Sequence, residues 1–230
     1  MGLCPRLAFS ILPTLEYNQA LIIRAMQADT SSFDIGAAVA AVKSTLAVPA
    51  PAPGQPVLVM LCGLPGTGKS TLARILAGRL PAVVVESDRV RRKLFDPPTY
   101  TVEESQRVHT VCHILMGWYL RHYYHVVYDA TNLYEHHRSM VYRLAERSGA
   151  RLVVTQVTAR DEVVRARLKS RRQGAPVTRA PQDYSDADWA VYVDMLRRAE
   201  PIRHDHITLD TSDGDVERAV QRVLAAARSR

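Results

Sequence analysis

The chain has 230 residues, 47% of them hydrophobic and 23% charged, which is enough to bury one α/β core and a small appendage. No apolar run approaches the roughly 18 residues that cross a bilayer, and the apolar stretch over residues 7–12 is too short for a signal peptide. We therefore expect a cytoplasmic protein without a membrane partner. Its cysteines, Cys4, Cys62 and Cys112, lie far apart, which argues against a disulfide framework or a zinc site.

The net charge of +7 leaves two interpretations open. Clustered basic side chains bind the phosphates of nucleic acids by releasing counterions, so a polyanionic partner suits this charge. Nearly all of the positive charge is arginine, however, because lysine occurs only at positions 43, 69, 93 and 169, and such a bias is also typical of a GC-rich genome. Net charge influences how a protein associates with partners, but it does not indicate a catalytic mechanism. The sequence does not give the oligomeric state.

The first 48 residues predict a helical extension. Leu15–Met26 and Ile35–Leu46 carry apolar residues at helical spacing, and Asp34 stands where an N-cap of the second helix would. Residues 49–56 read PAPAPGQP and predict a stiff, extended linker. We therefore expect a helical N-terminal extension over residues 1–48, a linker over 49–56 and a catalytic domain over 57–230.

After the linker, short apolar runs alternate with longer amphipathic segments, the order typical of βαβ units around a parallel sheet. The apolar runs predict strands over Val57–Cys62, Ala82–Val85, Val126–Tyr128, Leu152–Val157 and Ile207–Leu209. The amphipathic segments predict helices over Lys69–Leu80, Thr101–His122, His136–Ser148, Asp161–Arg172, Asp186–Ala199 and Val216–Ala227. Two of these starts resemble capping boxes, Thr101 with Glu104 and Ser185 with Asp188. The expected fold class is α/β, with three layers around a mainly parallel five-stranded sheet.

A glycine-rich segment between the first strand and the first helix fits the pattern GxxxxGK[ST]. It consists of Gly63, Leu64, Pro65, Gly66, Thr67, Gly68, Lys69 and Ser70, followed by Thr71. Glycines let such a loop curl so that backbone N–H groups converge on the phosphates of a nucleotide. Lys69 would reach the β- and γ-phosphates, and the Ser70 hydroxyl would bind Mg²⁺. A chance glycine turn would not place strand, loop, lysine, serine and helix in register, so we expect ATP and Mg²⁺ as ligands.

The second strand leads into Asp88 and Arg91, at the strand end where open α/β sheets bind ligands. A carboxylate there can accept the proton of an attacking hydroxyl, so Asp88 is the candidate general base. Arg91 lies one helical turn further on and could hold an anionic group of the acceptor. The alternative is that Asp88 caps a helix and Arg91 is a solvated surface charge.

The third strand ends in Asp129, in the arrangement that binds the Mg²⁺ shell in P-loop proteins. Motor-type ATPases follow this aspartate with a glutamate that polarises water, but here Ala130 follows, which argues against an ATPase. Thr131 and Asn132 come next, where they either position a substrate or cap the following helix.

The segment from Asp161 to Gly174 is basic and predicts a helical lid. Arg167 and Arg171 are spaced i,i+4, so they share a helix face and could close on the transferring phosphoryl group. The alternative is a solvated basic face of a surface helix.

On these residues the chain resembles the P-loop kinases around the kinase domain of phage-type polynucleotide 5′-hydroxyl kinases, together with zeta-toxin-like and chloramphenicol-phosphotransferase-like enzymes. The resemblance spans about residues 57–199. It implies that Asp88 is the general base, that Arg91 contacts the acceptor nucleotide and that Arg167 with Arg171 is the arginine pair of the lid. The family's Asp-Thr-Asn loop corresponds to Asp129-Ala130-Thr131-Asn132, which contains one additional alanine.

We therefore expect an ATP- and Mg²⁺-dependent kinase for a hydroxyl acceptor. The 5′-OH of DNA or RNA is the first candidate acceptor, and a small alcohol, sugar, nucleoside or antibiotic is the alternative. A nucleotide-binding switch without significant transfer is the alternative from another class.

Two clusters of ring side chains allow weaker interpretations. His109 with His113, and His136 with His137, could suggest a metal site, but the spacing shows no clear third ligand. An aromatic cluster before the third strand either stacks on a nucleic-acid base or packs in the core; it consists of Trp118, Tyr119, Tyr123 and Tyr124.

Overall fold

The computed structural model describes residues 33–172 and 187–228. Contacts within the chain divide it into Met1–Ile35 and Gly36–Arg230, and the fold described below belongs to the second unit. The first of the two expected N-terminal helices and Ser185 lie outside the described residues. In the part of the chain that the structure describes, no helix combines the length and apolar character needed to cross a membrane.

Five strands form one sheet with the order β2-β3-β1-β4-β5, and every neighbouring pair is parallel. The strands are β1 Val57–Cys62, β2 Ala82–Glu86, β3 His125–Asp129, β4 Arg151–Thr158 and β5 Ile207–Asp210. All five predicted strands are confirmed, and β2 to β5 extend by one or two residues beyond the prediction. Because every residue of the central strand β1 is buried, the uninterrupted apolar run in the sequence is explained by helices covering both faces of the sheet.

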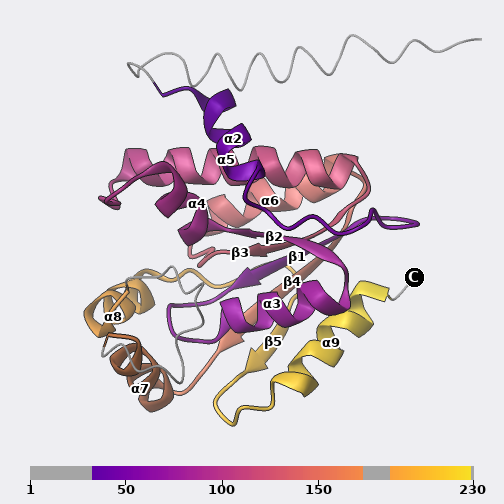
Figure 1. The fold of residues 1–230 in the computed structure, drawn as a ribbon. Helices are drawn as coiled ribbons and strands as arrows, with labels where there is room; N and C mark the ends of the chain where they lie inside the picture. Colours follow the sequence, from indigo (N-terminus) through magenta and orange to yellow (C-terminus); the bar gives the residue numbers. More distant parts are fainter. Residues whose placement is uncertain (1–32, 173–186, 229–230) are drawn as a thin grey trace, which may run out of the picture. The chain divides into compact units, whose positions relative to one another are not determined.

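Helices cover both faces of this sheet, as Figure 1 shows. The described helices are α2 Ile35–Lys43, α3 Lys69–Arg79, α4 Ser87–Leu94, α5 Val102–Arg121, α6 Glu135–Arg147, α7 Asp161–Arg172, α8 Trp189–Arg198 and α9 Val216–Arg228. Helices α3 and α9 pack on one face, while α5 and α6 pack on the other. The expected three-layer α/β fold is therefore confirmed. One apolar cluster lies between the sheet and the α3–α9 layer.

Helix boundaries follow the capping residues. Thr101 caps α5, since its side-chain oxygen accepts a hydrogen bond from the Glu104 backbone N–H at 3.2 Å. The predicted start of α8 at Asp186 is wrong, because Asp188 is the N-cap and accepts from the Val191 N–H at 3.1 Å. A serine, threonine or aspartate side chain that binds the N–H three residues on satisfies an otherwise unpaired donor, which fixes the first residue of the helix.

The sequence prediction omits α4. This helix has only eight residues, most of them charged, and its N-cap position is Glu86. Asp88 therefore lies in the first turn of α4 and does not cap it. Burial of Val90 and Arg91 holds α4 in place, and this tertiary contact could not be read from helical periodicity in so short a segment.

Arg138 on α6 forms hydrogen bonds with two loops that are distant in the sequence. Its guanidinium is almost fully buried and donates to the carbonyl oxygens of Asn132 and Leu133, in the β3–α6 loop, at 2.8 and 3.0 Å. It also donates to the carbonyls of Glu200 and Pro201, after α8, at 3.0 and 2.7 Å. The β3–α6 loop and the end of α8 are thus held against each other at the carboxyl edge of the sheet.

We expect Arg138→Ala to lower the free energy of unfolding by about 3–5 kcal/mol, because one buried and three partly buried carbonyls lose their donor. Arg143→Ala on the same helix is the matched control, since Arg143 is exposed and surface changes usually stay within about 0.5 kcal/mol. Urea unfolding of both variants measures the difference. Equal stability of the two variants would contradict this assignment.

Candidate active site

The glycine-rich segment forms a phosphate loop between β1 and α3. Gly63 lies so close to β4 that a Cβ there would stand 2.3 Å from the Val157 carbonyl oxygen, so only glycine fits. Gly68 precedes α3 directly with φ 96°, in the left-handed region that favours glycine. The first N–H groups of α3 have no helical partner, and together with the helix dipole they form an anion site inside this loop.

Lys69 is buried, with 8% of its surface exposed. Its Nζ donates to the Leu64 carbonyl oxygen across the loop at 3.0 Å. Burial lowers the pKa of Lys69, while attraction to Asp129 and Asp88 opposes that shift. The Lys69 side chain is therefore held inside the phosphate loop, where the phosphates of a nucleotide would add negative charge beside it.

Asp129 at the end of β3 is the buried carboxylate of the site, 3% exposed. Burial raises its pKa, and the nearby Lys69 together with a hydrogen bond from the Ser70 hydroxyl opposes the rise. One carboxylate oxygen, Oδ2, is buried without a hydrogen-bond partner. A buried acceptor of this kind costs about 1–3 kcal/mol when it is left unpaired, so the site is suited to an added cation or donor.

Mg²⁺ fits this arrangement. It prefers oxygen ligands, keeps several waters and is usually held by one or two protein groups together with phosphate oxygens. Ser70 and Asp129 supply such oxygens beside the phosphate loop. No group of three or more histidine, cysteine or acidic side chains within the described residues is arranged to hold a metal by itself.

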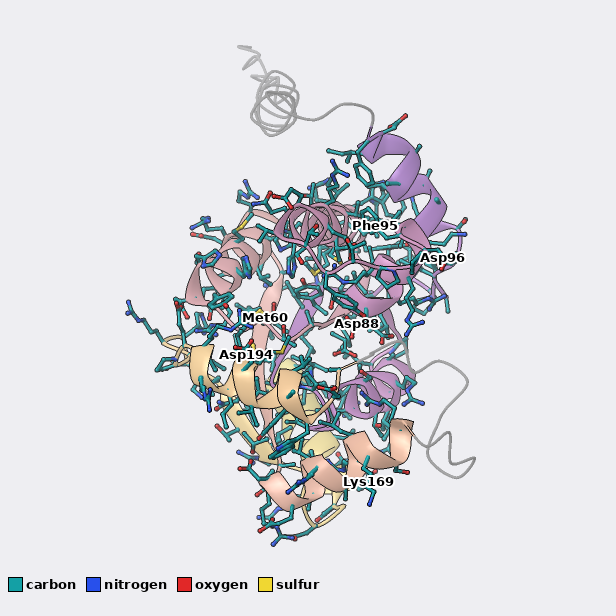
Figure 2. The ribbon with its side chains drawn as sticks, turned by 90° about the vertical axis from the view of Figure 1, so that its left-hand side faces the viewer. Met60, Asp88, Phe95, Asp96, Lys169 and Asp194 are labelled. Carbon is teal, nitrogen blue, oxygen red and sulfur yellow. The ribbon has the colours of Figure 1, made fainter. Side chains whose placement is uncertain are left out.

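Asp88 lies on the same edge of the sheet as this cluster. Its charge acts on both Lys69 and Asp129, so the structure brings together groups from α3, β3 and α4. Figure 2 looks onto the carboxyl ends of the strands and shows Asp88 between Phe95, after α4, and Lys169 on α7. Asp88 therefore lies near enough to Lys69 and Asp129 for its charge to influence both.

Arg91 fits neither of the two interpretations of the sequence. It is not a solvated surface charge, and it is not exposed to a ligand. It is 7% exposed and forms a buried ion pair with Glu104 of α5. A second nitrogen donates to Ser105 Oγ at 3.2 Å, and the guanidinium lies 4.8 Å from the ring centre of Tyr100. Arg91 thus joins α4 to α5, and an acceptor would contact it only after this pair opens.

Thr131 and Asn132 do not cap α6, whose N-cap position is Tyr134. Instead they join the β3–α6 loop to β1. The Gly63 N–H donates to the Thr131 carbonyl oxygen at 3.1 Å, and Asn132 Nδ2 donates to the Leu61 carbonyl oxygen at 2.7 Å. Asn132 is 2% exposed, and its Oδ1 has no partner.

The two lid arginines on α7 differ in their contacts. Arg167 donates to the Gly66 carbonyl oxygen at 3.2 Å and to the hydroxyl and carbonyl oxygens of Thr211 at 2.9 and 2.8 Å. Arg171 is close enough to Lys69 to influence its pKa. Arg167 therefore supports the phosphate loop from outside, and Arg171 is the one whose charge reaches the site.

Sequence reasoning missed Thr211, which follows β5. Its hydroxyl donates to the Thr67 carbonyl oxygen of the phosphate loop at 2.7 Å and accepts from Arg167. It is 5% exposed and so links the loop, α7 and the end of β5. A threonine two residues after the predicted strand was the available signal, and it does not identify the partners 144 and 44 residues away.

The histidine and aromatic clusters are packed between elements. His109 Nδ1 lies 3.1 Å from the Tyr128 hydroxyl, and its ring centre lies 4.9 Å from that of His137. Tyr119 is fully buried, and Lys43 of α2 covers the Trp118 ring, with Nζ 3.1 Å from its centre. The core interpretation of the aromatic cluster therefore holds for Tyr119, whereas Trp118 is half-buried and Tyr123 is exposed.

Comparisons with known proteins agree with this geometry. The family model described as "AAA domain" matches residues 58–202, and no curated protein matches the chain in sequence. The fold is similar to that of a proposed kinase from Chloroflexus aurantiacus, with a TM-score of 0.60 at 20% identity, covering 75% of this chain and 99% of that one.

Two further solved structures have the same fold. The APS kinase CysC of Mycobacterium tuberculosis, in complex with AMPPNP and APS, has a TM-score of 0.58 at 16% identity, covering 77% of this chain and 100% of that one. A gluconokinase from Sinorhizobium meliloti has a TM-score of 0.53 at 18% identity, covering 75% of this chain and 91% of that one. At these identities the likeness establishes the fold alone.

The buried histidines predict loss of stability in acid. Burial first, and the neighbouring His137 next, lower the pKa of His109 to about 3 and that of His113 to about 4, from 6.5. The unfolded chain therefore binds more protons than the folded protein below about pH 6.5. Their contribution to stability is complete above that pH and is lost as the pH falls toward 4 and 3.

Melting temperatures measured from pH 7 to pH 4 test this expectation. The melting temperature of the double variant His109→Gln, His113→Gln should fall less steeply with decreasing pH than that of the native chain. The exposed His204→Gln variant should show the same pH dependence as the native chain. If the melting temperature of the double variant depends on pH as steeply as that of the native chain, groups other than these two histidines cause the acid sensitivity.

Proposed function

The chain belongs to the AAA domain family, and within it we propose an ATP- and Mg²⁺-dependent kinase that transfers the γ-phosphoryl group to a hydroxyl. One observation carries this proposal: Lys69 inside the phosphate loop, the Ser70–Asp129 pair and Asp88 share one edge of the sheet and act on one another electrostatically. Charge stabilisation, metal binding and proton acceptance are the three contributions that such a transfer requires.

The phosphate loop and the start of α3 bind the triphosphate through backbone N–H groups. Ser70 and Asp129 would hold Mg²⁺, which would neutralise negative charge on the phosphates. Lys69 reaches the β- and γ-phosphates and stabilises the charge that develops on the leaving diphosphate. Arg171 adds positive charge from α7, while Arg167 keeps the loop in position.

Asp88 is the general base of the proposed reaction. The acceptor oxygen forms a bond to the γ-phosphorus and its proton passes to the Asp88 carboxylate, while the bond from that phosphorus to the bridging oxygen breaks and ADP leaves with the electron pair. Ala130 stands where motor-type ATPases carry their water-polarising glutamate, which favours an alcohol over water as the acceptor.

A small hydroxyl compound is the acceptor that the geometry supports best. The polynucleotide acceptor predicted first depends on Arg91 for a nucleotide contact, and Arg91 is paired with Glu104 in the interior. Two proteins of the same fold carry names of enzymes that act on small molecules, the APS kinase and the gluconokinase. Nucleic acid as acceptor is therefore the alternative outcome of the test.

We expect Asp88→Asn to lower kcat about 10²–10⁴-fold, the usual contribution of a general base, while ATP affinity stays within about twofold. The assay follows labelled γ-phosphate from ATP with Mg²⁺ onto a panel of sugars, nucleosides, small alcohols and 5′-OH oligonucleotides. Asp96→Asn is the control, because Asp96 is exposed in the α4–α5 connection (Figure 2).

Undiminished transfer by Asp88→Asn would contradict the assignment of the base. If the native protein binds ATP but labels no acceptor, the protein is a nucleotide-dependent switch and the proposal fails. Label on an oligonucleotide would replace the small acceptor by nucleic acid.

A further inference from the structure

A pocket of about 280 Å³ opens beside the phosphate loop, at the carboxyl edge of the sheet. Its walls are Gly63 and Leu64 of the loop, residues 131–133 of the β3–α6 loop, the end of β4, and α8 with the residues that follow it. Neither Asp88 nor Arg91 lines it. The volume is just below the usual range for small-molecule sites, about 300–1,000 Å³.

This pocket adjoins the site of the proposed reaction. The hydrogen bond from the Gly63 N–H to the Thr131 carbonyl oxygen joins two of its walls. Thr131 follows Asp129 by two residues, and Asp129 holds Ser70 of the phosphate loop. A compound seated in the pocket therefore lies against the loop that carries the triphosphate.

The charged side chains that line the pocket already have partners. Arg138 donates from Nε to Glu135 Oε2 at 2.9 Å, and its two terminal nitrogens donate to four backbone carbonyls. Its five N–H groups are thus occupied. The other charged lining residue, Glu200, accepts from the Glu135 backbone N–H at 2.7 Å, at the start of α6. An anionic ligand would find no uncommitted cation among the described lining residues, because the Arg138 donors are occupied.

The remaining lining is apolar with a few hydrogen-bonding groups. Leu133, Tyr192, Leu196 and Ile202 supply apolar surface. Asn132, which also lines the pocket, has its Oδ1 buried without a hydrogen-bond partner. An unpaired amide oxygen accepts a hydrogen bond from a hydroxyl or amine, and pairing it recovers part of the free energy of its burial.

We propose that this pocket binds the body of the acceptor, and that the acceptor is an alcohol that carries no negative charge and has an apolar part about the size of one ring. The inference rests on the proposed function, because it locates the second substrate of that reaction. It differs from the resemblance-based expectation, which places an anionic nucleotide at Arg91. The hydroxyl that reacts extends from the pocket past the phosphate loop.

Two exposed residues of α8 provide a matched pair of variants. Leu196 lines the pocket and is 48% exposed, whereas Val191 is 38% exposed and does not line it. Leu196→Trp fills the pocket mouth with a larger ring, and Val191→Trp places the same ring elsewhere on the same helix. Because both positions are exposed, both variants should fold, and retained binding of ATP with Mg²⁺ serves as the check.

The probes are benzyl alcohol and phenyl glucoside, with benzoate, phenyl phosphate and a 5′-OH oligonucleotide as charged counterparts. Binding is measured by ligand-observed NMR in the presence of a non-hydrolysable ATP analogue and Mg²⁺. We expect the neutral probes to bind the native chain and Val191→Trp, to bind Leu196→Trp at least tenfold more weakly, and to outcompete the charged probes.

Failure of both neutral probes to bind would overturn the proposal, as would equal binding to Leu196→Trp or preferential binding of the phosphate or the oligonucleotide. Transfer of labelled phosphate is measured separately on the same variants. Transfer that Leu196→Trp leaves unchanged would reject this pocket and keep the kinase. If the neutral probes bind at the pocket but phosphate is transferred to no acceptor, the proposed kinase activity is rejected. The pocket's role as an acceptor site is then rejected as well.

Discussion

The electrostatic attraction between the buried side chains of Lys69 and Asp129 is the interaction on which the rest of the site depends. Removing two charges from water costs several kcal/mol per ion, and mutual attraction recovers this only in part. The opposed pKa shifts reflect that cost, since burial lowers the pKa of Lys69 and raises that of Asp129. Triphosphate and Mg²⁺ would each supply the missing counter-charge, so a site that is costly when empty becomes favourable when it is filled.

Buried polar contacts then position the other parts around this pair. Thr211 and Arg167 brace the phosphate loop from the α7 side, and Asn132 holds the β3–α6 loop to β1. Arg138 joins that loop to the end of α8. Each of these connections spans 44 residues or more in the sequence, so the sheet edge is shaped by long-range hydrogen bonds between its loops. The pocket beside the loop is one result.

The sequence predicted the elements that depend on local signals. Apolar runs identified all five strands, and the glycine pattern located the phosphate loop, because both follow from composition over short windows. Asp88 and Asp129 could be selected because they stand at strand ends. The buried pairing of Arg91 with Glu104, the role of Thr211 and helix α4 could not be predicted, since each depends on tertiary contacts that periodicity does not encode. The sequence also cannot distinguish a basic side chain that is free to bind a ligand from one that is already in an ion pair.

The most direct test of the central claim is the Mg²⁺ dependence of ATP binding, measured by calorimetry on the native chain and on Asp129→Asn. If Asp129 and Ser70 hold the metal, Mg²⁺ should tighten ATP binding to the native chain by about tenfold or more, which corresponds to about 1.4 kcal/mol. Asp129→Asn should lose most of that gain while still binding ATP through the phosphate loop. An equal gain from Mg²⁺ in both proteins would contradict the account.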